Sequence, residues 1–383
     1  MNRSRWLMVG ADFIPHGGTE APNYRLARYL AARGEVHLVA HGAWPDLTSL
    51  STVTFHRVWR PFGWQFLGHS CLSLIGQRVW RQLSSRGIHA IVNGGNCPIG
   101  DVNWVHYVHA AYTPVIAGSM VRRAKGSLFH QRDLADERRA LRRARVVVCN
   151  SRRTQADVVE RLGVESSRTH VVYYGTDPAA FAPVTDAERT AAKQALGLSP
   201  DRPTVGFVGA LGDRRKAFDS VFRAWGTLCR RTDWDADLLV AGGGGELSAW
   251  RRRARDTGLE ERVRFTGYRR DMPTVFGALD ALVHPARYEA YGLGVHESLC
   301  RGVPALVSAS AGVAEQYPQD LSDLLIADAD NPGEIAERLL AWRRDIARFR
   351  ERVAPVSASL RARTWDGMAA EVATLVERAG APG

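Results

Sequence analysis

Two glutamates, Glu289 and Glu297, lie eight positions apart in the segment Glu-Ala-Tyr-Gly-Leu-Gly-Val-His-Glu. Gly292 and Gly294 stand between them, where an apolar run ends and a helical pattern of apolar residues begins. A strand, a glycine loop and a helix N-terminus in this order bring free backbone N–H groups and the positive end of the helix dipole together. The segment therefore predicts a site for phosphate or sugar oxygens, with a carboxylate at each end that can bind hydroxyl groups.

The same segment resembles the Glu-(seven residues)-Glu signature of the retaining nucleotide-sugar glycosyltransferases with the GT-B fold, family 4 (glycosyl transferases group 1). The resemblance extends to Gly302-Val303-Pro304, which leads into the next predicted strand. It implies that Glu289 is catalytic and binds hydroxyls of the donor sugar, and that Glu297 binds the ribose diol of the donor. It also implies donor contacts for three residues between the glutamates, namely Tyr291, Gly292 and Leu293.

A lysine is notable because the chain has 48 arginines and only three lysines. Lys216 follows Arg214 and Arg215 in a segment that runs from an apolar strand pattern into a helical pattern. A compact ammonium at a helix start can neutralise the charge that a leaving pyrophosphate develops when a glycosidic bond breaks. We therefore expect Lys216 to bind a pyrophosphate, and a charged helix cap is the alternative.

This segment is also similar to the family's Gly-x-x…Lys-Gly-x-Asp element, with Gly209, Lys216 and Asp219 at the matching places. It departs from the element at Ala210, where an arginine is often found, and at Ala217, where the family has glycine. The resemblance implies that Lys216 is catalytic and that Gly209 and Lys216 bind the donor. The second cation must then come from one of two residues that the sequence does not separate, Arg214 and Arg215.

Two further glycine loops follow predicted strands. Gly17 and Gly18 would let the backbone approach a donor phosphate or the acceptor closely. A plain turn also explains them, but they match the Gly-Gly loop that opens family-4 enzymes. Gly243 lies in the run Gly242–Gly245 and is expected to line the nucleotide side, although the run lacks the last glycine of a dinucleotide fingerprint.

Histidines follow the strand pattern Val102–Val105 in the order His106-Tyr107-Val108-His109. Open α/β sheets bind ligands at the carboxyl ends of their strands, and this region is similar to the family's acceptor-side histidine. We therefore predict a catalytic role for His109 near the donor sugar, ahead of His106 and His296. A histidine that only satisfies the core is the alternative.

No metal or other cofactor is expected. Asp233-Trp234-Asp235 has the Asp-x-Asp spacing of metal-dependent glycosyltransferases, but it precedes a strand pattern and should lie at the amino end of the sheet. The motifs of serine hydrolases, zinc proteases and P-loop NTPases are absent. Five scattered cysteines without a Cys-x-x-Cys pair indicate neither a disulfide framework nor a zinc site.

The candidate residues need a scaffold that brings several loops together. Both halves alternate short apolar runs with helical patterns, which is typical of parallel sheets covered by helices on both faces. Strands are expected at 6–11, 36–40, 88–92, 102–108, 146–149, 170–174, 204–208, 237–241, 263–266, 281–283 and 305–307. Helices are expected at 20–33, 69–85, 119–143, 152–162 and 357–378. The fold class is therefore α/β with two Rossmann-like domains, and the resemblance implies GT-B, in which they face a central cleft.

Length and turn residues divide the chain. A sequence of 383 residues is too long for one ordinary core and suits two domains. Gly175-Thr176-Asp177-Pro178 closes the last strand pattern of the first half. We expect an acceptor-binding domain over 1–178, a nucleotide-sugar-binding domain over 179–355 and, by the resemblance, a terminal helix over 356–383 that packs back on the first domain.

The net charge of +11 belongs to the first half of the chain. Residues 1–180 hold 23 Lys and Arg against 12 Asp and Glu, whereas residues 181–383 hold 28 of each. Within the first half, the segment Arg122–Arg153 has eleven basic residues. Such a patch attracts an anionic membrane surface or a lipid-phosphate acceptor, and a solvated helix face is the alternative.

The sequence as a whole predicts a metal-independent, retaining glycosyltransferase that uses a nucleoside-diphosphate sugar and a glycan, lipid-linked or small-molecule acceptor, as in polysaccharide biosynthesis. No apolar run reaches the roughly 18 residues of a membrane span, and the N-terminal apolar run is too short for a signal peptide. We expect a cytoplasmic protein, peripheral on the inner face of the membrane, with no nucleic acid partner. The alternatives are a nucleotide-sugar epimerase of the same fold and a non-catalytic polyanion-binding protein.

Overall fold

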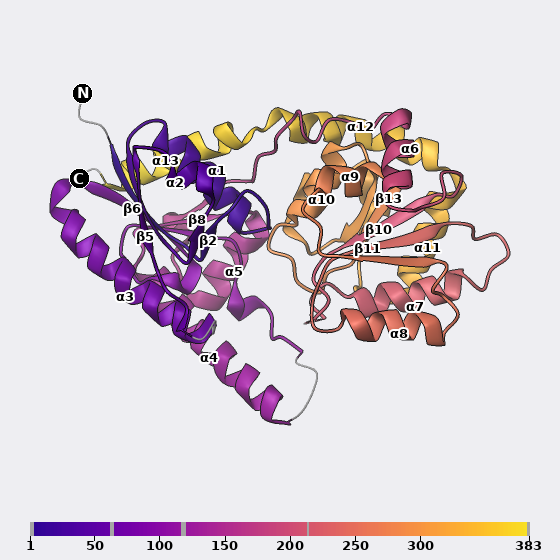
Figure 1. Ribbon diagram of the computed structural model, residues 1–383, viewed down its shortest axis with the longest axis horizontal. Coiled ribbons are helices and arrows are strands. Elements are labelled where there is room, and N and C mark those ends of the chain that lie inside the picture. Colours follow the sequence, from indigo (N-terminus) through magenta and orange to yellow (C-terminus); the bar gives the residue numbers. More distant parts are fainter. Residues whose placement is uncertain (1–3, 62–64, 116–119, 213, 381–383) are drawn as a thin grey trace. The chain divides into compact units, whose positions relative to one another are not determined.

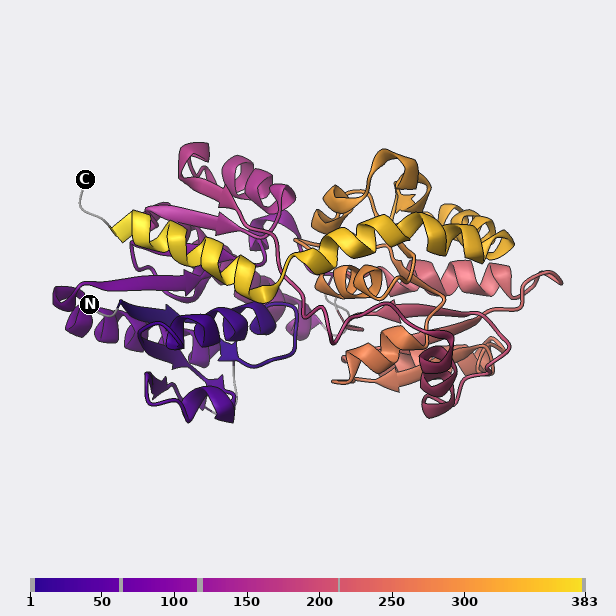
Figure 2. The same cartoon turned by 90° about the horizontal axis from the view of Figure 1, so that it is seen from above.

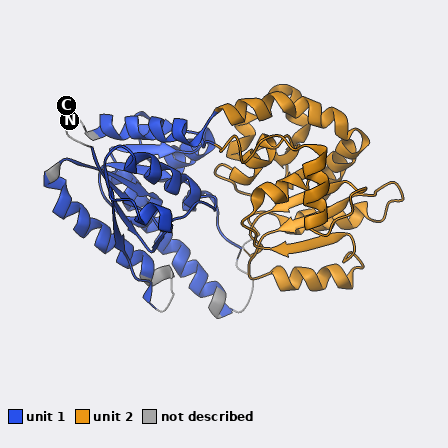
Figure 3. Cartoon of the chain, turned by 45° about the horizontal axis from the view of Figure 1, so that its top comes forward, with its two compact units in different colours: residues 1–175, 363–383 blue, residues 176–362 orange. Residues whose placement is uncertain are grey.

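The structure is a computed structural model that describes residues 4–61, 65–115, 120–212 and 214–380. The chain divides into two compact units, residues 1–175 with 363–383 (unit 1) and residues 176–362 (unit 2) (Figure 3). Each unit has a parallel sheet with helices on both faces (Figure 1). The predicted α/β architecture of two Rossmann-like domains is confirmed.

Unit 1 is built on a parallel sheet in the order β5-β3-β1-β6-β7-β8-β9 among the described residues. A small second sheet pairs β2 with β4 at the carboxyl end of β1. The strands are β1 Arg5–Val9, β2 Asp12–Phe13, β3 Glu35–Ala40, β4 Gly42–Ala43, β5 Val53–Arg57, β6 Ile88–Asn93, β7 Val102–Val105, β8 Val146–Cys149 and β9 Thr169–Val171.

Helices cover both faces of this sheet, and α13 runs beside α1 on one of them (Figure 2). The helices of unit 1 are α1 Glu20–Ala31, α2 Pro45–Thr48, α3 Gln65–Leu83, α4 Met120–Arg143, α5 Arg152–Leu162 and α13 Trp365–Gly380. Short 3-10 turns stand at η2 Ser84–Arg86, η3 Gly94–Asn96, η4 His109–Ala111 and η5 Ser166–Arg168.

Local sequence explains why these elements begin and end where they do. In β1, four consecutive residues from Trp6 are buried, as expected for a strand covered on both faces. Leu7 and Val9 pack against Leu72 of α3, and each buried side chain stabilises the unit by about 1.5–3 kcal/mol. Helix α5 starts where the Ser151 side chain accepts the N–H of Thr154 and ends at Gly163 in the left-handed region.

Unit 2 repeats the plan in the order β12-β11-β10-β13-β14-β15 within its described residues. The strands are β10 Thr204–Val208, β11 Asp237–Ala241, β12 Val263–Gly267, β13 Ala281–His284, β14 Ala305–Ser308 and β15 Leu325–Ile326. The helices are α6 Asp186–Ala195, α7 Phe218–Leu228, α8 Leu247–Asp256, α9 Met272–Gly277, α10 Leu293–Cys300, α11 Pro332–Arg344 and α12 Ile346–Ala362. The 3-10 turns are η6 Gly312–Gln316 and η7 Gln319–Leu324.

The C-terminal part of the chain differs from its expected outline. A single helix was expected over 357–378, but the structure has α12 and α13, separated at Arg363 and Thr364. Pro355 lies inside α12 rather than before a helix. Helix α12 packs on α10 of unit 2, whereas α13 packs on α1, β6 and β8 of unit 1. None of the described helices combines the length and the hydropathy that a membrane span requires.

Candidate active site

The strand order of unit 2 determines where its loops meet. The order reverses between β10 and its neighbour β13, and open α/β sheets bind ligands beyond the carboxyl ends of the strands at such a point. The loop after β10 carries Lys216, and the loop after β13 carries Glu289. Residues 73 positions apart in the chain therefore come together at one edge of the sheet.

A cluster of three mostly buried side chains forms at this edge. The ammonium of Lys216 is ion-paired with the carboxylate of Glu289, and His284 Nε2 lies 2.9 Å from Glu289 Oε2. The exposed fractions of the Lys216, Glu289 and His284 side chains are 14%, 11% and 4%. The structure thus brings together Lys216 and Glu289, which were predicted from separate motifs, and adds His284, which the sequence analysis missed.

Charge and burial act on Glu289 in opposite directions. Burial disfavours its carboxylate, but the charge of Lys216, the hydrogen bond with His284 and the charge of Arg215 together hold the pKa of Glu289 well below its usual range. Burial and the charge of Lys216 lower the pKa of His284, so that its imidazole is neutral at pH 7. Glu289 is therefore an anion throughout the physiological range and can accept hydrogen bonds from sugar hydroxyls.

The two candidate cations for a pyrophosphate differ in position. Arg215 donates from Nη1 to the Tyr288 carbonyl at 3.2 Å, and this nitrogen lies 3.9 Å from Glu289 Oε1. The Nε of Arg214 instead lies 4.0 Å from Glu246 Oε1, and the Arg214 side chain is 45% exposed against 18% for Arg215. Arg215 therefore belongs to the cluster and Arg214 does not. Asp213, the residue before them, lies outside the described residues.

Arg287 joins the two loops that carry the cluster. Its guanidinium forms a bidentate ion pair with Asp219, with both N–O distances 2.9 Å, and Nε donates to Asp330 at 2.8 Å. The backbone N–H of Arg287 donates to the Arg215 carbonyl at 2.8 Å. Asp219, the matched aspartate of the predicted element, thus positions the Lys216 loop against the Glu289 loop. The sequence analysis missed Arg287 because one arginine among 48 gives no signal.

Close packing of two backbones explains the glycines of the neighbouring loops. A Cβ on Gly242 would lie 1.8 Å from the Gly209 carbonyl oxygen, and one on Gly244 would lie 2.2 Å from the Leu211 carbonyl oxygen. The N–H of Leu211 donates to the Gly243 carbonyl at 2.8 Å. The predicted donor-binding residues Gly209 and Gly243 therefore belong to one layer of backbone beyond the carboxyl ends of β10 and β11.

The Glu-(seven residues)-Glu segment forms a loop that ends in a helix start. Gly292 precedes α10 with a φ of +111°, a conformation that disfavours any side chain. Leu293 begins the helix; the amides of Val295 and His296 donate to the Gly292 carbonyl, both at 3.0 Å. The amides of Leu293 and Gly294 have no carbonyl one turn earlier. Tyr291 is buried with its hydroxyl 2.7 Å from His296 Nδ1, which gives both residues a structural role. Glu297 is half-buried in the second turn.

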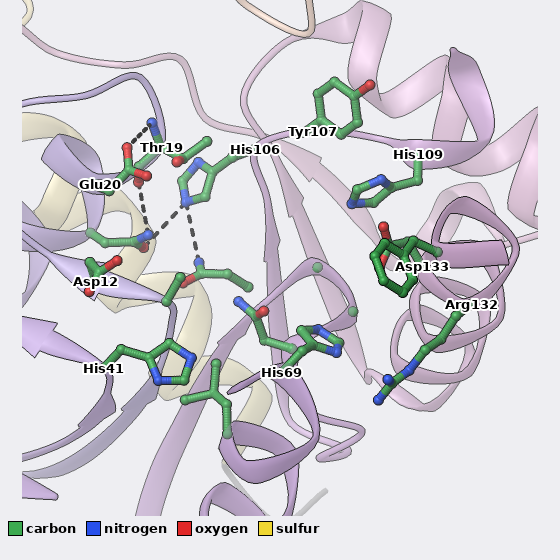
Figure 4. A pocket seen from close by; sticks show the side chains of 18 of the residues that line it. Asp12, Thr19, Glu20, His41, His69, His106, Tyr107, His109, Arg132 and Asp133 are labelled. Atoms are coloured by element: carbon green, nitrogen blue, oxygen red, sulfur yellow. Dashed lines mark hydrogen bonds between the residues drawn. The ribbon is translucent and has the colours of Figure 1, made fainter. Parts of the chain in front are cut away.

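Unit 1 holds a cavity of about 600 Å³ at its own point of strand-order reversal, between β1 and β6 (Figure 4). Loops after these strands line it, together with the start of α1 and side chains of α3 and α4. His109, predicted as catalytic, is one of the lining residues. Gly17 and Gly18 lie directly before Thr19, which also lines the cavity, and Gly17 has a φ of +101°.

A chain of hydrogen bonds fixes one wall of this cavity. His106 Nδ1 lies 2.6 Å from the Tyr174 hydroxyl, and His106 Nε2 lies 3.2 Å from Asn23 Oδ1. Asn150 donates to the Tyr174 hydroxyl at 3.0 Å, and Asn23 donates to the Thr19 carbonyl at 2.9 Å. Burial lowers the pKa of His106 to about 3. His106 is therefore a neutral structural histidine that holds the start of α1.

His109 is held through its backbone by a buried glutamate. Glu137 of α4 accepts the N–H of His109 at 2.8 Å and that of Ala110 at 3.2 Å. Burial raises the pKa of Glu137 to about 7, against the effect of these two hydrogen bonds. Burial also lowers the pKa of His109, while Asp133 opposes that change; Asp133 lies beside His109 (Figure 4). The sequence analysis missed Glu137, as it missed His284 and Arg287 in unit 2.

The Asp-x-Asp segment has other partners. Asp233 is paired with Arg231 at 2.8 Å, and Asp235 is paired with Arg343 at 2.6 Å. Both aspartates precede β11 and lie at the amino end of the sheet, away from the cluster. Within the described ranges, no group of three or more His, Cys, Asp or Glu side chains has the arrangement of a metal site.

The two halves of the chain match two family models. Residues 16–180 match the family described as Glycosyltransferase Family 4, and residues 202–345 match Glycosyl transferases group 1. The chain belongs to the family-4 glycosyltransferases. The first match covers most of unit 1 and ends at residue 180, just past the break between the units, and the second lies within unit 2.

Relatives of this family-4 chain differ in the acceptors for which they are named. The chain is 31% identical to the lipopolysaccharide core biosynthesis mannosyltransferase LpsB of Rhizobium meliloti, over 60% of this chain and 63% of LpsB. It is 28% identical to the D-inositol 3-phosphate glycosyltransferase of Corynebacterium urealyticum, over 62% of this chain and 57% of that protein. The chain thus spans less than two thirds of the length of either relative.

A solved structure agrees with the fold. Anabaena HepE, in complex with UDP and glucose, is similar with a TM-score of 0.70 and 18% sequence identity, over 98% of this chain and 100% of HepE. At that identity the likeness shows the fold alone. The GT-B fold expected from the resemblance is confirmed.

Proposed function

We propose that the protein is a retaining glycosyltransferase that moves a hexosyl group from a nucleoside-diphosphate sugar to a hydroxyl of a glycan, lipid-linked or small-molecule acceptor. The observation that carries the proposal is the buried cluster of Lys216, Glu289 and His284 at the point where the strand order of unit 2 reverses. The solved complex of HepE with UDP and glucose supports a nucleotide sugar as the donor.

The cluster supplies opposite charges for two parts of one donor. Lys216 and Arg215 bind the pyrophosphate, and the carboxylate of Glu289 accepts hydrogen bonds from hydroxyls of the transferred sugar. Glu297, in the second turn of α10, binds the ribose diol. The first-turn amides of α10 add a partial positive charge next to the phosphates. Binding of the donor in this way replaces the ion pair between Lys216 and Glu289.

Transfer breaks the bond between the anomeric carbon and the β-phosphate oxygen and forms a bond from that carbon to the acceptor oxygen on the same face. The acceptor proton moves to the departing phosphate oxygen, so that atoms and charge balance. Lys216 and Arg215 stabilise the charge that develops on the leaving group. Glu289 holds the sugar in place without forming a bond to it. The role of His109 beside the donor sugar stays a prediction.

The acceptor is assigned to unit 1, whose family-4 match includes Gly17, Gly18 and His109. We place this unit on an anionic membrane surface at the inner face of the membrane. Helix α4 carries exposed basic residues such as Arg123 and exposed apolar ones, with Met120 80% and Leu128 66% exposed. This combination suits a surface of acidic head groups. Of the predicted patch, the Arg122 side chain lies outside the described residues.

A thermal-shift panel of UDP-, GDP-, ADP- and dTDP-sugars tests the proposal. A cognate donor at 100 times its dissociation constant should stabilise the protein by about 2.7 kcal/mol. The panel is run in excess EDTA because the proposed site needs no metal. A shift that appears only after Mn²⁺ is added would contradict metal independence, and absence of any shift would contradict the donor site. Release of a C2 epimer of the sugar without acceptor would favour the epimerase instead.

A further inference from the structure

The cavity of unit 1 is balanced in charge although the first half of the chain is strongly basic. Its described lining contains as many cationic side chains as carboxylates, namely Arg60, Lys125 and Arg132 against Asp12, Glu20 and Asp133. Arg60 is ion-paired with Asp12 at 2.8 Å, and Arg132 is ion-paired with Asp136 at 3.4 Å. The excess of positive charge in residues 1–180 therefore lies outside this cavity.

Four imidazoles line the cavity, and three of them add no charge at neutral pH. Burial lowers the pKa of His41, of His106 and of His109. Each of these rings is neutral at pH 7 and offers one donor and one acceptor. These three rings therefore leave the balance between cations and carboxylates unchanged, and the fourth, His69, lies 3.5 Å from the carboxylate of Asp136.

The helix start in the cavity is also neutralised. Helix α1 begins at Glu20, and a free helix N-terminus attracts anions. Here the carboxylate of Glu20 accepts the N–H of Thr19 at 3.2 Å. A phosphate at the helix start would have to displace this carboxylate, and a phosphate at Arg60 would have to compete with Asp12. Both routes bring two negative charges close together, which is unfavourable.

The remaining lining suits hydroxyl groups. Asn93 and Asn96 line the cavity with amides, a group that both donates and accepts, and Tyr107 and Phe129 add aromatic rings to the lining. A volume of about 600 Å³ lies within the usual range of sites for small molecules. A ring with several hydroxyls can both donate and accept at neighbouring positions, as such a lining requires.

We propose that the unit 1 cavity binds an uncharged polyhydroxylated ring, a sugar or a cyclitol, and discriminates against its phosphorylated form. The proposal rests on the assigned glycosyl transfer, since it names the chemical class of the acceptor. It separates this chain from relatives that are named for a phosphorylated acceptor. Asp12 and Glu20 are its specificity-determining residues, because they occupy two places where a phosphate would otherwise bind, the Arg60 guanidinium and the start of α1.

The test compares uncharged ligands with their monophosphates. The probes are methyl mannoside, methyl glucoside and myo-inositol, each with its monophosphate, and binding to the full chain is followed by saturation-transfer NMR in the presence of UDP. At least one uncharged probe should bind at least 10-fold more tightly than its phosphate. Asp12→Asn should remove most of this preference, because Arg60 loses its partner. Glu20→Gln, at the helix start, should also reduce the preference for the uncharged probe. It replaces Asp12→Asn in the test if that variant does not fold.

Glu371→Gln is the matched control, because Glu371 pairs with Arg363 on the surface of the same unit without lining the cavity. It should leave the preference unchanged. Equal or tighter binding of the phosphates to the wild type would overturn the proposal, as would binding of neither set, or an unchanged preference in both cavity variants. The thermal shift by nucleotide sugars is measured on the same samples. A normal donor shift with any of these results would refute the acceptor class alone and leave the donor site standing.

Discussion

Each unit holds a glutamate with little exposure at its candidate site, and the pKa values of the two glutamates are shifted in opposite directions. Glu289 of unit 2 faces Lys216 and Arg215, which hold its pKa well below the usual range despite burial. Glu137 of unit 1 has two backbone N–H groups as its closest partners, and burial raises its pKa to about 7. Full positive charges therefore outweigh the cost of burying a carboxylate, whereas peptide dipoles offset only part of it.

The difference in pKa indicates different roles: Glu289 contacts the donor, and Glu137 positions the backbone. A carboxylate that stays charged next to a lysine suits a site that must bind a charged and hydroxylated donor. A carboxylate that holds two N–H groups of η4 fixes the backbone of His109 without reaching a ligand itself. Substitutions in both units test this difference.

The largest effect is expected at the unit 2 cluster. Lys216→Ala and Glu289→Ala should each lower turnover by roughly 100-fold or more, about 2.7 kcal/mol, because each removes a contact to the reacting donor. Steady-state kinetics with the cognate donor measures the effect. Glu289→Gln keeps the size of the side chain and should lose as much.

Arg230→Ala, an exposed arginine of the same unit, is the control and should be near wild type. Circular dichroism establishes that each variant is folded. Turnover close to wild type in a folded Lys216→Ala protein would refute the assignment of the cluster.

The next effect concerns stability against pH. Because the folded-state pKa of Glu137 is raised, folded protein binds more protons than unfolded protein between about pH 4.5 and pH 7, and stability falls as pH rises through this window. Glu137→Gln removes this dependence. From pH 5 to pH 8 its free energy of unfolding should therefore gain roughly 1–3 kcal/mol relative to wild type.

Urea unfolding at each pH gives these values. Glu289→Gln is the comparison, because the lowered pKa of Glu289 stabilises the protein above about pH 4.5 and that stabilisation is lost only at more acid pH. Its difference from wild type should stay constant from pH 5 to pH 8. Parallel curves for Glu137→Gln and wild type would show that Glu137 is not the titrating group.

A smaller effect separates the two arginines of the donor loop. Arg215→Ala should weaken donor binding by about 10-fold, or 1.4 kcal/mol, because Arg215 lies beside Glu289. Arg214→Ala should change it by less than about 2-fold, because that side chain faces Glu246 and is more exposed. Calorimetric titration with the cognate donor measures both constants. The reverse ranking would place Arg214 on the pyrophosphate.

The smallest effect is expected at the membrane. Binding to vesicles should increase with anionic lipid, decrease with added salt, and fall by about 5-fold in Arg123→Gln, since one arginine near such a surface contributes about 1 kcal/mol. Flotation measures the bound fraction, with Arg230→Gln of unit 2 as the control. Equal recovery on neutral and anionic vesicles, or none on either, would leave α4 as an ordinary solvated helix.

Much of the fold could be predicted because its strands are short and almost fully apolar. β1, β10 and β13 stand out in the sequence for this reason. β5 was missed because its residues are half-exposed at the edge of the sheet. The strand expected over 102–108 ends at Val105, where the chain turns away and exposes part of Tyr107. The pattern of apolar residues indicates which residues are buried. It therefore fails to predict a strand at the exposed edge of a sheet, or the end of a strand at a turn.

The site of unit 2 was more predictable than that of unit 1. Two continuous motifs contain Lys216, Glu289 and their glycines, so that short stretches of sequence are enough to identify these residues. Arg287 and Glu137 act through contacts 68 and 28 positions away, and nothing in their neighbourhood marks them. The residues that line the cavity of unit 1 come from many elements. Because only folding brings these residues together, no continuous motif marks them in the sequence.

Retention of the anomeric configuration and the role of Lys216 can be measured together in one NMR experiment. The cognate nucleotide sugar, labelled with ¹³C at its anomeric carbon, is incubated with the protein and an acceptor, and the anomeric signal is followed by NMR. The account predicts a new glycoside with the same anomeric configuration as the donor, formed together with the nucleoside diphosphate and slowed by roughly 100-fold in Lys216→Ala. A product of inverted configuration, or unchanged transfer by the folded variant, would contradict it.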